Sequence, residues 1–183
     1  MERCMTASWD DRLWKLAEPI YDRAFPREGR KTDTIIRSML ARGVGQLHLG
    51  MQDGQAQAMA LTGRAKRCNA IIIDYLAVRE ELRGRGIGQA FFGAVRQWAE
   101  MDEKTNGIII EVESEPTPEN ASRVRFWQSC GFRLTDYVHR YRWVPETYQA
   151  MYLPFYDEAA LPTEGEELFR SINAFHAQAY RSS

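Results

Sequence analysis

Three glycines at alternate positions mark the segment of this chain that could bind a phosphate group. Gly84, Gly86 and Gly88 follow the apolar strand pattern of Ala70–Val78 and open a strongly amphipathic helical pattern. Because glycine has no side chain, the backbone amides of such a turn can approach a ligand closely. These amides and the positive end of the helix dipole converge on one point, which favours phosphate oxygens. The segment therefore predicts a site for a phosphorylated ligand.

Two common phosphate-binding loops do not match these residues. A dinucleotide-binding GxGxxG motif starting at Gly84 needs glycine where Gln89 stands, and no acidic residue follows at the required distance on a second strand. A Walker loop needs lysine and then serine or threonine after its last glycine, where this sequence has Gln89 and Ala90. The alternative without a ligand is a plain glycine-rich corner between a strand and a helix.

The spacing Arg83-x-x-Gly86-x-Gly88, which begins five residues after Val78, resembles the acetyl-CoA signature of the GCN5-related N-acetyltransferases, the GNAT superfamily. In that family the central sheet splays open beside the strand before the glycine turn, and the pantetheine arm of the cofactor fills the gap. The resemblance implies acetyl-CoA as the cofactor and a cofactor-binding segment that consists of Leu76, Ala77, Val78, Arg83, Gly84, Arg85, Gly86, Ile87 and Gly88. For the two arginine side chains, solvated turn residues are the alternative.

A second signature lies further along the chain. Asn120-x5-Phe126-Trp127-x3-Gly131-Phe132 resembles the N-x5-F-Y-x3-G-F segment of the same family. The resemblance adds Asn120, Phe126 and Trp127 to the cofactor-binding residues, with Asn120 as a polar contact to the pantetheine. Helix capping is an alternative role for Asn120, and packing in the core is an alternative role for Phe126.

Trp127 departs from the family pattern, in which a tyrosine can return a proton to the departing thiolate. An indole N–H donates a hydrogen bond but supplies no proton at neutral pH. The proton then comes from water or from another group, or no dedicated acid is needed. The tyrosines of the last strands are candidates for that group: Tyr137, Tyr141, Tyr148 and Tyr152. Cys130 is near in sequence and is expected in the core.

The implied reaction is direct attack of a primary amine on the acetyl thioester. Because the amine arrives mostly protonated, a base must first accept a proton. Asp74 lies on the strand that lines the cofactor gap, and Glu113 extends from the neighbouring strand. We therefore predict Asp74 and Glu113 as catalytic residues. The alternatives are a hydrogen-bonded strand residue for Asp74 and a solvated strand end for Glu113.

Two further sets of residues bear on the acceptor. An acidic cluster would favour a cationic acceptor electrostatically, and it comprises Glu111, Glu113, Glu115 and Glu119. An aromatic set is the candidate wall of an acceptor pocket, and it comprises Tyr137, Tyr141, Trp143, Tyr148 and Tyr152. A solvated acidic loop and aromatic packing in the core or an interface are the alternatives.

The hydrophobic periodicity predicts a chain that alternates helices and strands. The expected elements are a strand Arg3–Ala7, a helix capped by Ser8 and stopped by Pro26, a helix around Ile35–Leu40 ending at Gly43, a hairpin with its turn at Asp53-Gly54, the strand Ala70–Val78, a helix Ile87–Met101, the strand Ile108–Val112, a helix capped by Thr117, the strands Phe132–Trp143 and Thr147–Phe155, and a last helix at about 163–181. This order matches the GNAT fold, of class α/β (α+β), with a mixed central sheet of about seven strands flanked by helices. The last helix is an addition to that fold.

Composition excludes several other classes of protein. The chain has 183 residues with 44% hydrophobic and 27% charged residues, which predicts one soluble globular domain over residues 1–183. A net charge of −1 gives no reason to expect nucleic acid, and an aminoacyl-tRNA-acetylating toxin is disfavoured on the same ground. No run is long enough for a membrane span, and the start of the chain has no signal-peptide pattern. Three well-separated cysteines and three histidines suggest neither a disulfide framework nor a metal site, so the expected location is the cytoplasm.

The sequence therefore predicts an acetyl-CoA-dependent N-acetyltransferase that acts on the primary amine of a small molecule or a protein. The rival hypothesis is a non-catalytic acyl-CoA-binding or sensing domain, which the replacement of tyrosine by Trp127 keeps open. The last helix is expected to cover a sheet face or an oligomer interface, and a homodimer is one expected assembly.

Overall fold

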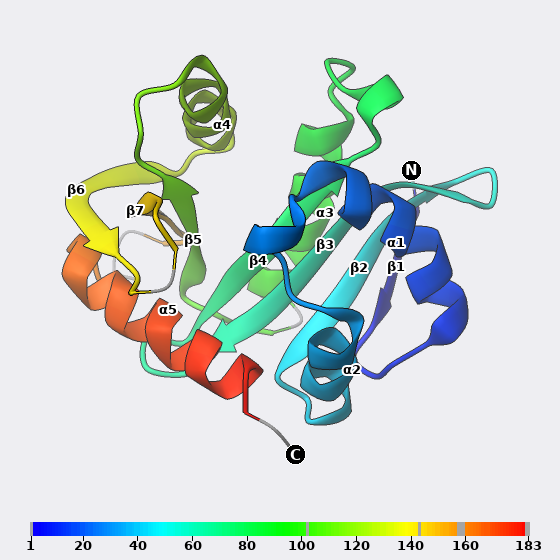
Figure 1. Cartoon of the computed structure of the whole chain (residues 1–183), viewed down its shortest axis with the longest axis horizontal. Coiled ribbons are helices and arrows are strands. Elements are labelled where there is room, and N and C mark those ends of the chain that lie inside the picture. Colours follow the sequence, from blue (N-terminus) through cyan, green and yellow to red (C-terminus); the bar gives the residue numbers. More distant parts are fainter. Residues whose placement is uncertain (1, 102, 143, 157–159, 182–183) are drawn as a thin grey trace. The chain divides into compact units, whose positions relative to one another are not determined.

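A computed structural model of the chain describes residues 2–101, 103–142, 144–156 and 160–181 (Figure 1). Its seven strands have the order β1-β2-β3-β4-β5-β7-β6, with bounds β1 Glu2–Thr6, β2 Gly45–Gln52, β3 Gln55–Ala65, β4 Ala70–Val78, β5 Gly107–Glu113, β6 Arg133–Arg140 and β7 Thr147–Pro154. The helices are α1 Asp11–Ala24, α2 Asp33–Ala41, α3 Ile87–Met101, α4 Pro118–Ser129 and α5 Gly165–Ala179, with short 3-10 turns η1 Arg27–Gly29 and η2 Glu80–Leu82. The predicted mixed sheet of seven strands with flanking helices is confirmed.

The chain forms two compact units. The first comprises the chain up to Gly63, Ile73–Trp98 and the chain from His176 onward. The second comprises Arg64–Ile72 and Ala99–Phe175. Strand β4 contributes its first residues to the second unit and the remainder to the first.

In the first unit, β1, β2 and β3 form an antiparallel meander. The turn between β2 and β3 is at Asp53 and Gly54, which have φ angles of 51° and 75°, as a type I′ hairpin requires. The core is an apolar cluster from α1, α2 and the strands, and its members include Trp14, Ile20, Tyr21, Ile36, Leu47, Leu61 and Tyr75. The hairpin prediction is confirmed, and β3 continues to Ala65.

Helix α1 begins later than predicted. The carboxylate of Asp10 accepts hydrogen bonds from the amides of Arg12 and Leu13, at 2.8 and 3.0 Å, and caps the helix. Ser8 instead belongs to the preceding turn, where its carbonyl accepts a hydrogen bond from the Thr6 hydroxyl. The prediction of Ser8 as the cap was wrong because a carboxylate nearer the apolar helical pattern satisfies the first free amides better.

In the second unit, the start of β4 pairs in parallel with β5, and β5 pairs antiparallel with β7. Residues Ile108, Ile109 and Ile110 of β5 are buried, as expected of an internal strand. Helix α4 begins where the sequence predicted, because the Thr117 hydroxyl accepts a hydrogen bond from the Asn120 amide at 3.1 Å. Strand β6 ends at Arg140, and Trp143 lies outside the described residues.

Candidate active site

The glycine turn comprises residues 84–88. It follows the end of β4 and leads into the start of α3, in the first unit. Gly84 and Gly86 have φ angles of 74° and 77°, a conformation that favours glycine. A Cβ atom added at either residue would meet no atom within 4 Å. Glycine is therefore needed for the backbone conformation, and the space beside the turn is open. Since the first amides of an α-helix have no partner inside the helix, the turn can donate hydrogen bonds to a ligand.

Strand β4 alternates between partly exposed and buried residues before the turn. Asp74, Leu76 and Val78 are partly exposed, whereas Tyr75 and Ala77 between them are buried. The alternation is that of a strand with one covered face, although the side chain of Asp74 itself is only 4% exposed.

A cavity of about 290 Å³ lies beside this turn. Its lining comes from α1, from the last residue of β4 and from the segment after β4, and consists of Pro19, Ile20, Arg23, Val78, Arg79, Glu80, Glu81 and Arg83. The Arg83 Nε donates a hydrogen bond to the Val78 carbonyl at 3.3 Å, which holds this side chain against the end of β4. Arg85 is exposed in the turn. The sequence did not indicate that Arg23 lines this cavity, because nothing near Arg23 in the chain relates it to the end of β4.

Asp74 is held in a buried ion pair. Its two carboxylate oxygens lie 2.9 and 2.8 Å from Nζ of Lys31, and the two side chains are 4% and 2% exposed. Nζ also lies 3.5 Å from Nδ1 of His176 and 5.3 Å from the ring centres of Tyr75 and Tyr180. Asp74 is therefore already committed to a cation of the protein itself.

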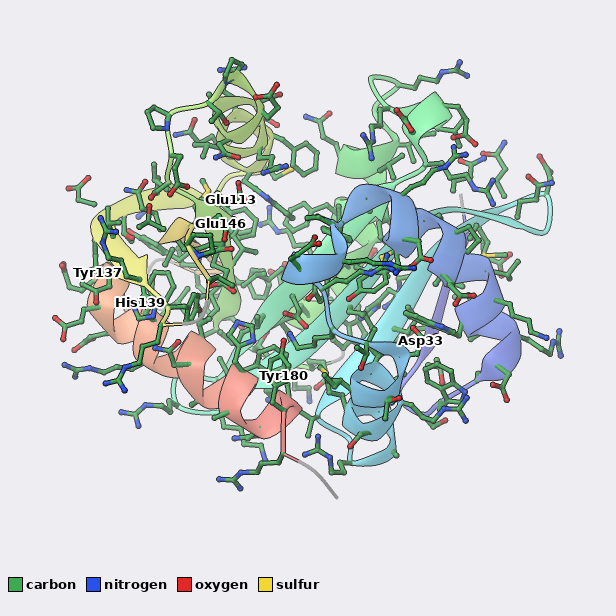
Figure 2. All side chains as sticks on the ribbon, viewed as in Figure 1. Asp33, Glu113, Tyr137, His139, Glu146 and Tyr180 are labelled. Atoms are coloured by element: carbon green, nitrogen blue, oxygen red, sulfur yellow. The ribbon has the colours of Figure 1, made fainter. Side chains whose placement is uncertain are left out.

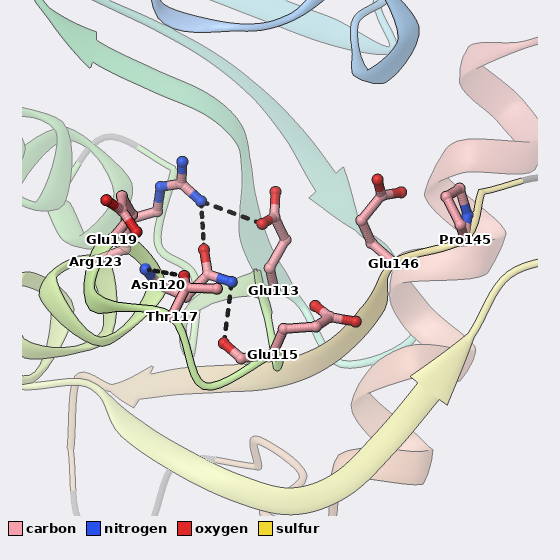
Figure 3. A pocket seen from close by; sticks show the side chains of 8 residues that line it. All are labelled: Glu113, Glu115, Thr117, Glu119, Asn120, Arg123, Pro145 and Glu146. Atoms are coloured by element: carbon pink, nitrogen blue, oxygen red, sulfur yellow. Dashed lines mark hydrogen bonds and ion pairs between the residues drawn. The ribbon is translucent and has the colours of Figure 1, made fainter.

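Glu113, at the end of β5, faces a second cavity, of about 420 Å³, in the second unit (Figure 3). The lining residues are Glu113, Glu115, Thr117, Glu119, Asn120, Arg123, Pro145 and Glu146. The side chain of Glu113 is 37% exposed, and its Oε2 lies 3.4 Å from Nη1 of Arg123. Figure 2 shows the carboxylate of Glu146, which the sequence did not single out, on the same side of the unit as Glu113. Four carboxylates and one guanidinium make this cavity acidic.

Asn120 is buried at the edge of this cavity. Its side-chain nitrogen donates to the Glu115 carbonyl at 3.1 Å, and its oxygen accepts a hydrogen bond from Arg123 at 2.7 Å. Its backbone amide donates a hydrogen bond to the Thr117 hydroxyl. Asn120 thus belongs to the first turn of α4, the position that a role in helix capping would need. Its side chain also lines the cavity beside Glu113.

The acidic cluster predicted from the sequence is divided between two places. Glu115 and Glu119 line the cavity with Glu113, whereas Glu111 accepts a hydrogen bond from the Tyr141 hydroxyl at 2.7 Å. The Thr147 amide and hydroxyl donate to Glu115 at 2.8 and 2.7 Å, and these bonds hold the pKa of Glu115 below its ordinary value.

The described members of the predicted aromatic set, and the histidine beside them, differ in environment. Burial, and the carboxylates Glu111 and Glu113, raise the pKa of Tyr148 to about 12. His139 of β6 stacks on Phe169 of α5 with ring centres 4.3 Å apart, and burial lowers the pKa of this histidine. Tyr137 is exposed on β6 beside His139 (Figure 2), and Tyr152 is buried.

Trp127 is part of an aromatic group at the end of α4. Its ring makes edge contacts with Phe126 and Phe132, with centres 5.0 and 5.1 Å apart. Cys130 is half-buried, and burial raises the pKa of its thiol. The first unit thus holds Asp74, the backbone before the turn and the glycine turn, and the second holds Glu113, Asn120, Phe126 and Trp127.

Two negative findings hold for the described residues. Within them, no helix is long and apolar enough to cross a membrane. The same part of the chain contains no group of three or more histidine, cysteine, aspartate or glutamate residues arranged to hold a metal ion.

Comparison with solved structures identifies the fold. A GNAT-family protein from Bacteroides thetaiotaomicron has a TM-score of 0.76 at 17% identity, with 100% of each chain covered. A ribosomal-protein-alanine N-acetyltransferase from Escherichia coli has a TM-score of 0.63 at 19% identity, over 84% of this chain and 94% of that one. An acetyltransferase from Bacillus subtilis, solved in complex with CoA, has a TM-score of 0.59 at 16% identity, over 85% of this chain and 99% of that one.

Sequence comparison gives the family. Curated protein sequences give no match. A family model described as an acetyltransferase (GNAT) domain matches residues 42–134, a span that includes β2 to β5, the glycine turn, α3 and α4. Because this match covers more than half of the chain and the fold agrees with it, the protein belongs to the GNAT acetyltransferase family.

Proposed function

We propose that this protein transfers the acetyl group of acetyl-CoA to a primary amine of a small molecule or a protein by direct attack of the amine. The observation that carries the proposal is the glycine turn. Gly84 and Gly86 hold a left-handed conformation at the start of α3, and open space lies where side chains would otherwise stand. Such a turn fits the diphosphate of coenzyme A.

The residues that would hold the cofactor are those that the two family signatures indicate. The amides of residues 84–88 would bind the diphosphate, with Arg83 and Arg85 adding positive charge. The backbone of Leu76, Ala77 and Val78 would bind the pantetheine amides. The second side-chain N–H of Asn120 would donate a hydrogen bond to the pantetheine. When bound, the cofactor supplies an activated thioester. We propose that residues 1–183 form one catalytic domain. The division of strand β4 between the two compact units supports this, because a single strand belongs to both.

Of the two predicted bases, the geometry favours Glu113. Its carboxylate is 37% exposed and faces a cavity, so an ammonium group can reach it. The Asp74 carboxylate is 4% exposed, and both of its oxygens contact Lys31. In our proposal Glu113 accepts a proton from the acceptor, directly or through one water, and the neutral amine then attacks the thioester carbonyl.

No protein acid is required in this proposal for the departing thiolate. The indole of Trp127 cannot supply a proton, and the hydroxyl of Tyr141 is already bonded to Glu111. Tyr148, whose pKa is raised to about 12, is a poor proton donor at neutral pH. The nitrogen of the tetrahedral intermediate releases its proton to water, and the thiolate leaves without a dedicated acid and takes a proton from water.

The acidic cavity supports a cationic acceptor. Glu113, Glu115, Glu119 and Glu146 line it with only one guanidinium among the eight lining residues. Negative walls raise the local concentration of a cation and speed its encounter with the site. A small diamine and a basic peptide amino group both satisfy this requirement. A cytoplasmic location completes the proposal, and three free cysteines support it.

Release of free thiol from acetyl-CoA, measured across a panel of primary amines, tests the proposal. We expect acceptor-dependent release, with cationic amines preferred over neutral ones. The rival function, a non-catalytic acyl-CoA-binding domain, is favoured by the replacement of the family tyrosine with Trp127. Tight binding of CoA without release of thiol for any amine would support that rival and contradict the transfer reaction.

A further inference from the structure

Arg123 connects two residues of the candidate active site. Its Nη1 donates a hydrogen bond to Oδ1 of Asn120 at 2.7 Å, and the same atom lies 3.4 Å from Oε2 of Glu113 (Figure 3). Arg123 is one turn along α4 from Asn120, so helix geometry places the two side chains as neighbours. One guanidinium nitrogen therefore joins the polar side chain at the start of α4 to the carboxylate at the end of β5.

The second anchor of Asn120 is on the loop before α4. The side-chain nitrogen donates one hydrogen to the Glu115 carbonyl at 3.1 Å. The Glu115 carboxylate in turn accepts hydrogen bonds from Thr147 at the start of β7, which fixes this loop. The amide of Asn120 is thus held from two sides, with its oxygen toward Arg123 and its nitrogen toward the loop.

This arrangement determines what Asn120 can offer a ligand. A primary amide has two N–H donors and one carbonyl acceptor. The oxygen and one N–H are in use, so the second N–H is left for a ligand. Asn120 is 5% exposed, and without the Arg123 bond its oxygen would lose a charged partner in a buried place. The amide could then rotate and present the wrong group.

We propose that Arg123 is a positioning residue, which orients the amide of Asn120 for the cofactor and links that amide to the base Glu113. The inference rests on the proposed function, because it assumes that Asn120 contacts the pantetheine of CoA. It is specific to Arg123. Arg125, two residues further along the same helix, is exposed and forms no hydrogen bond or ion pair with Asn120 or Glu113 in the described part of the chain.

Titration calorimetry with CoA tests this role, with kcat and KM measured in parallel. Arg123→Met should raise the Kd for CoA by about tenfold, since a charged hydrogen bond to a buried amide is lost. Arg123→Lys should recover most of the affinity, because a single cationic nitrogen makes both contacts in the structure. The matched control Arg125→Met should bind CoA as the wild type does. Arg123→Gln serves as the second variant should Arg123→Met fail to fold.

A double-mutant cycle isolates the path through Asn120. In an Asn120→Ala background, Arg123→Met should add less than about twofold to the Kd, because the amide that it orients is gone. An undiminished tenfold effect in that background, or a wild-type Kd in Arg123→Met, would overturn the inference. If the wild type itself binds no CoA, the proposed function fails instead, so the two failures are distinguishable.

Discussion

Acidification should destabilise this protein through His48. The imidazole on β2 is fully buried, its Nε2 lies 2.9 Å from the Thr62 hydroxyl, and its ring contacts the Trp98 ring with centres 4.6 Å apart. Nδ1 is buried and has no hydrogen-bond partner among the described residues. Burial, and to a smaller extent the charge of Arg3, lowers the pKa of His48 to about 3. The folded protein therefore keeps this imidazole neutral.

The sign of the effect follows from proton binding. The unfolded chain binds a proton at His48 below about pH 6.5, and the folded chain binds it only near pH 3. Between these values only the unfolded state gains the proton, so a fall in pH favours unfolding. From this residue alone, the free energy of unfolding should be about 2 kcal/mol lower at pH 5 than at pH 7.

Urea denaturation of the wild type and of His48→Gln at pH 7, 6 and 5 measures this contribution. Glutamine does not titrate and can still hydrogen-bond to Thr62. Acid effects of the carboxylates cancel when the two proteins are compared. The stability advantage of the wild type over the variant should shrink by about 2 kcal/mol from pH 7 to pH 5. Parallel pH dependences for the two proteins would refute the assignment of a neutral buried imidazole.

Three further predictions concern charge. Lys31→Met should lower the free energy of unfolding in urea by about 3–5 kcal/mol, since it leaves the Asp74 carboxylate buried without its partner. The double variant Lys31→Met with Asp74→Leu should regain most of that loss. A single variant as stable as the wild type would contradict the buried pair. Glu113→Gln should reduce kcat by about 10²–10⁴-fold with the Kd for CoA unchanged. In steady-state kinetics, the control Glu119→Gln from the same cavity should lose far less kcat. Equal losses in the two variants would remove Glu113 as the base. Raising the salt concentration should increase KM for cationic amines, because it screens the carboxylates of the cavity, and an unchanged KM would argue against an electrostatic role for the cavity.

Local chemistry explains what could be predicted from the sequence. The bounds of β4 agree with the prediction because an unbroken apolar run ends at a charged turn. The start of α4 agrees because Thr117 and Pro118 are strong signals for a helix start. The hairpin at Asp53-Gly54 agrees because that pair tolerates the positive φ angles that its turn requires.

Long-range pairing explains what could not be predicted. Lys31 and Asp74 are 43 positions apart, and nothing near either residue indicates the other. Their pairing makes one of the two predicted bases inaccessible, a distinction that the strand pattern alone does not make. Glu146 and Arg123 were missed for a similar reason, because only the folded second unit brings them to the cavity beside Glu113. The start of α1 was predicted wrongly because Ser8 and Asp10 have similar propensities as capping residues.

In the proposed function, the main chain of the glycine turn holds the diphosphate of coenzyme A. Calorimetry on Gly86→Val tests it, with acetyl-CoA and with acetyl-pantetheine, which lacks the diphosphate, as ligands. Gly93→Ala is the matched control, because a Cβ at that position of α3 also meets open space but lies outside the turn. We predict that Gly86→Val weakens acetyl-CoA binding by more than about tenfold and leaves acetyl-pantetheine binding and the control unchanged. An unaltered affinity of Gly86→Val for acetyl-CoA would contradict the binding of the diphosphate by this turn.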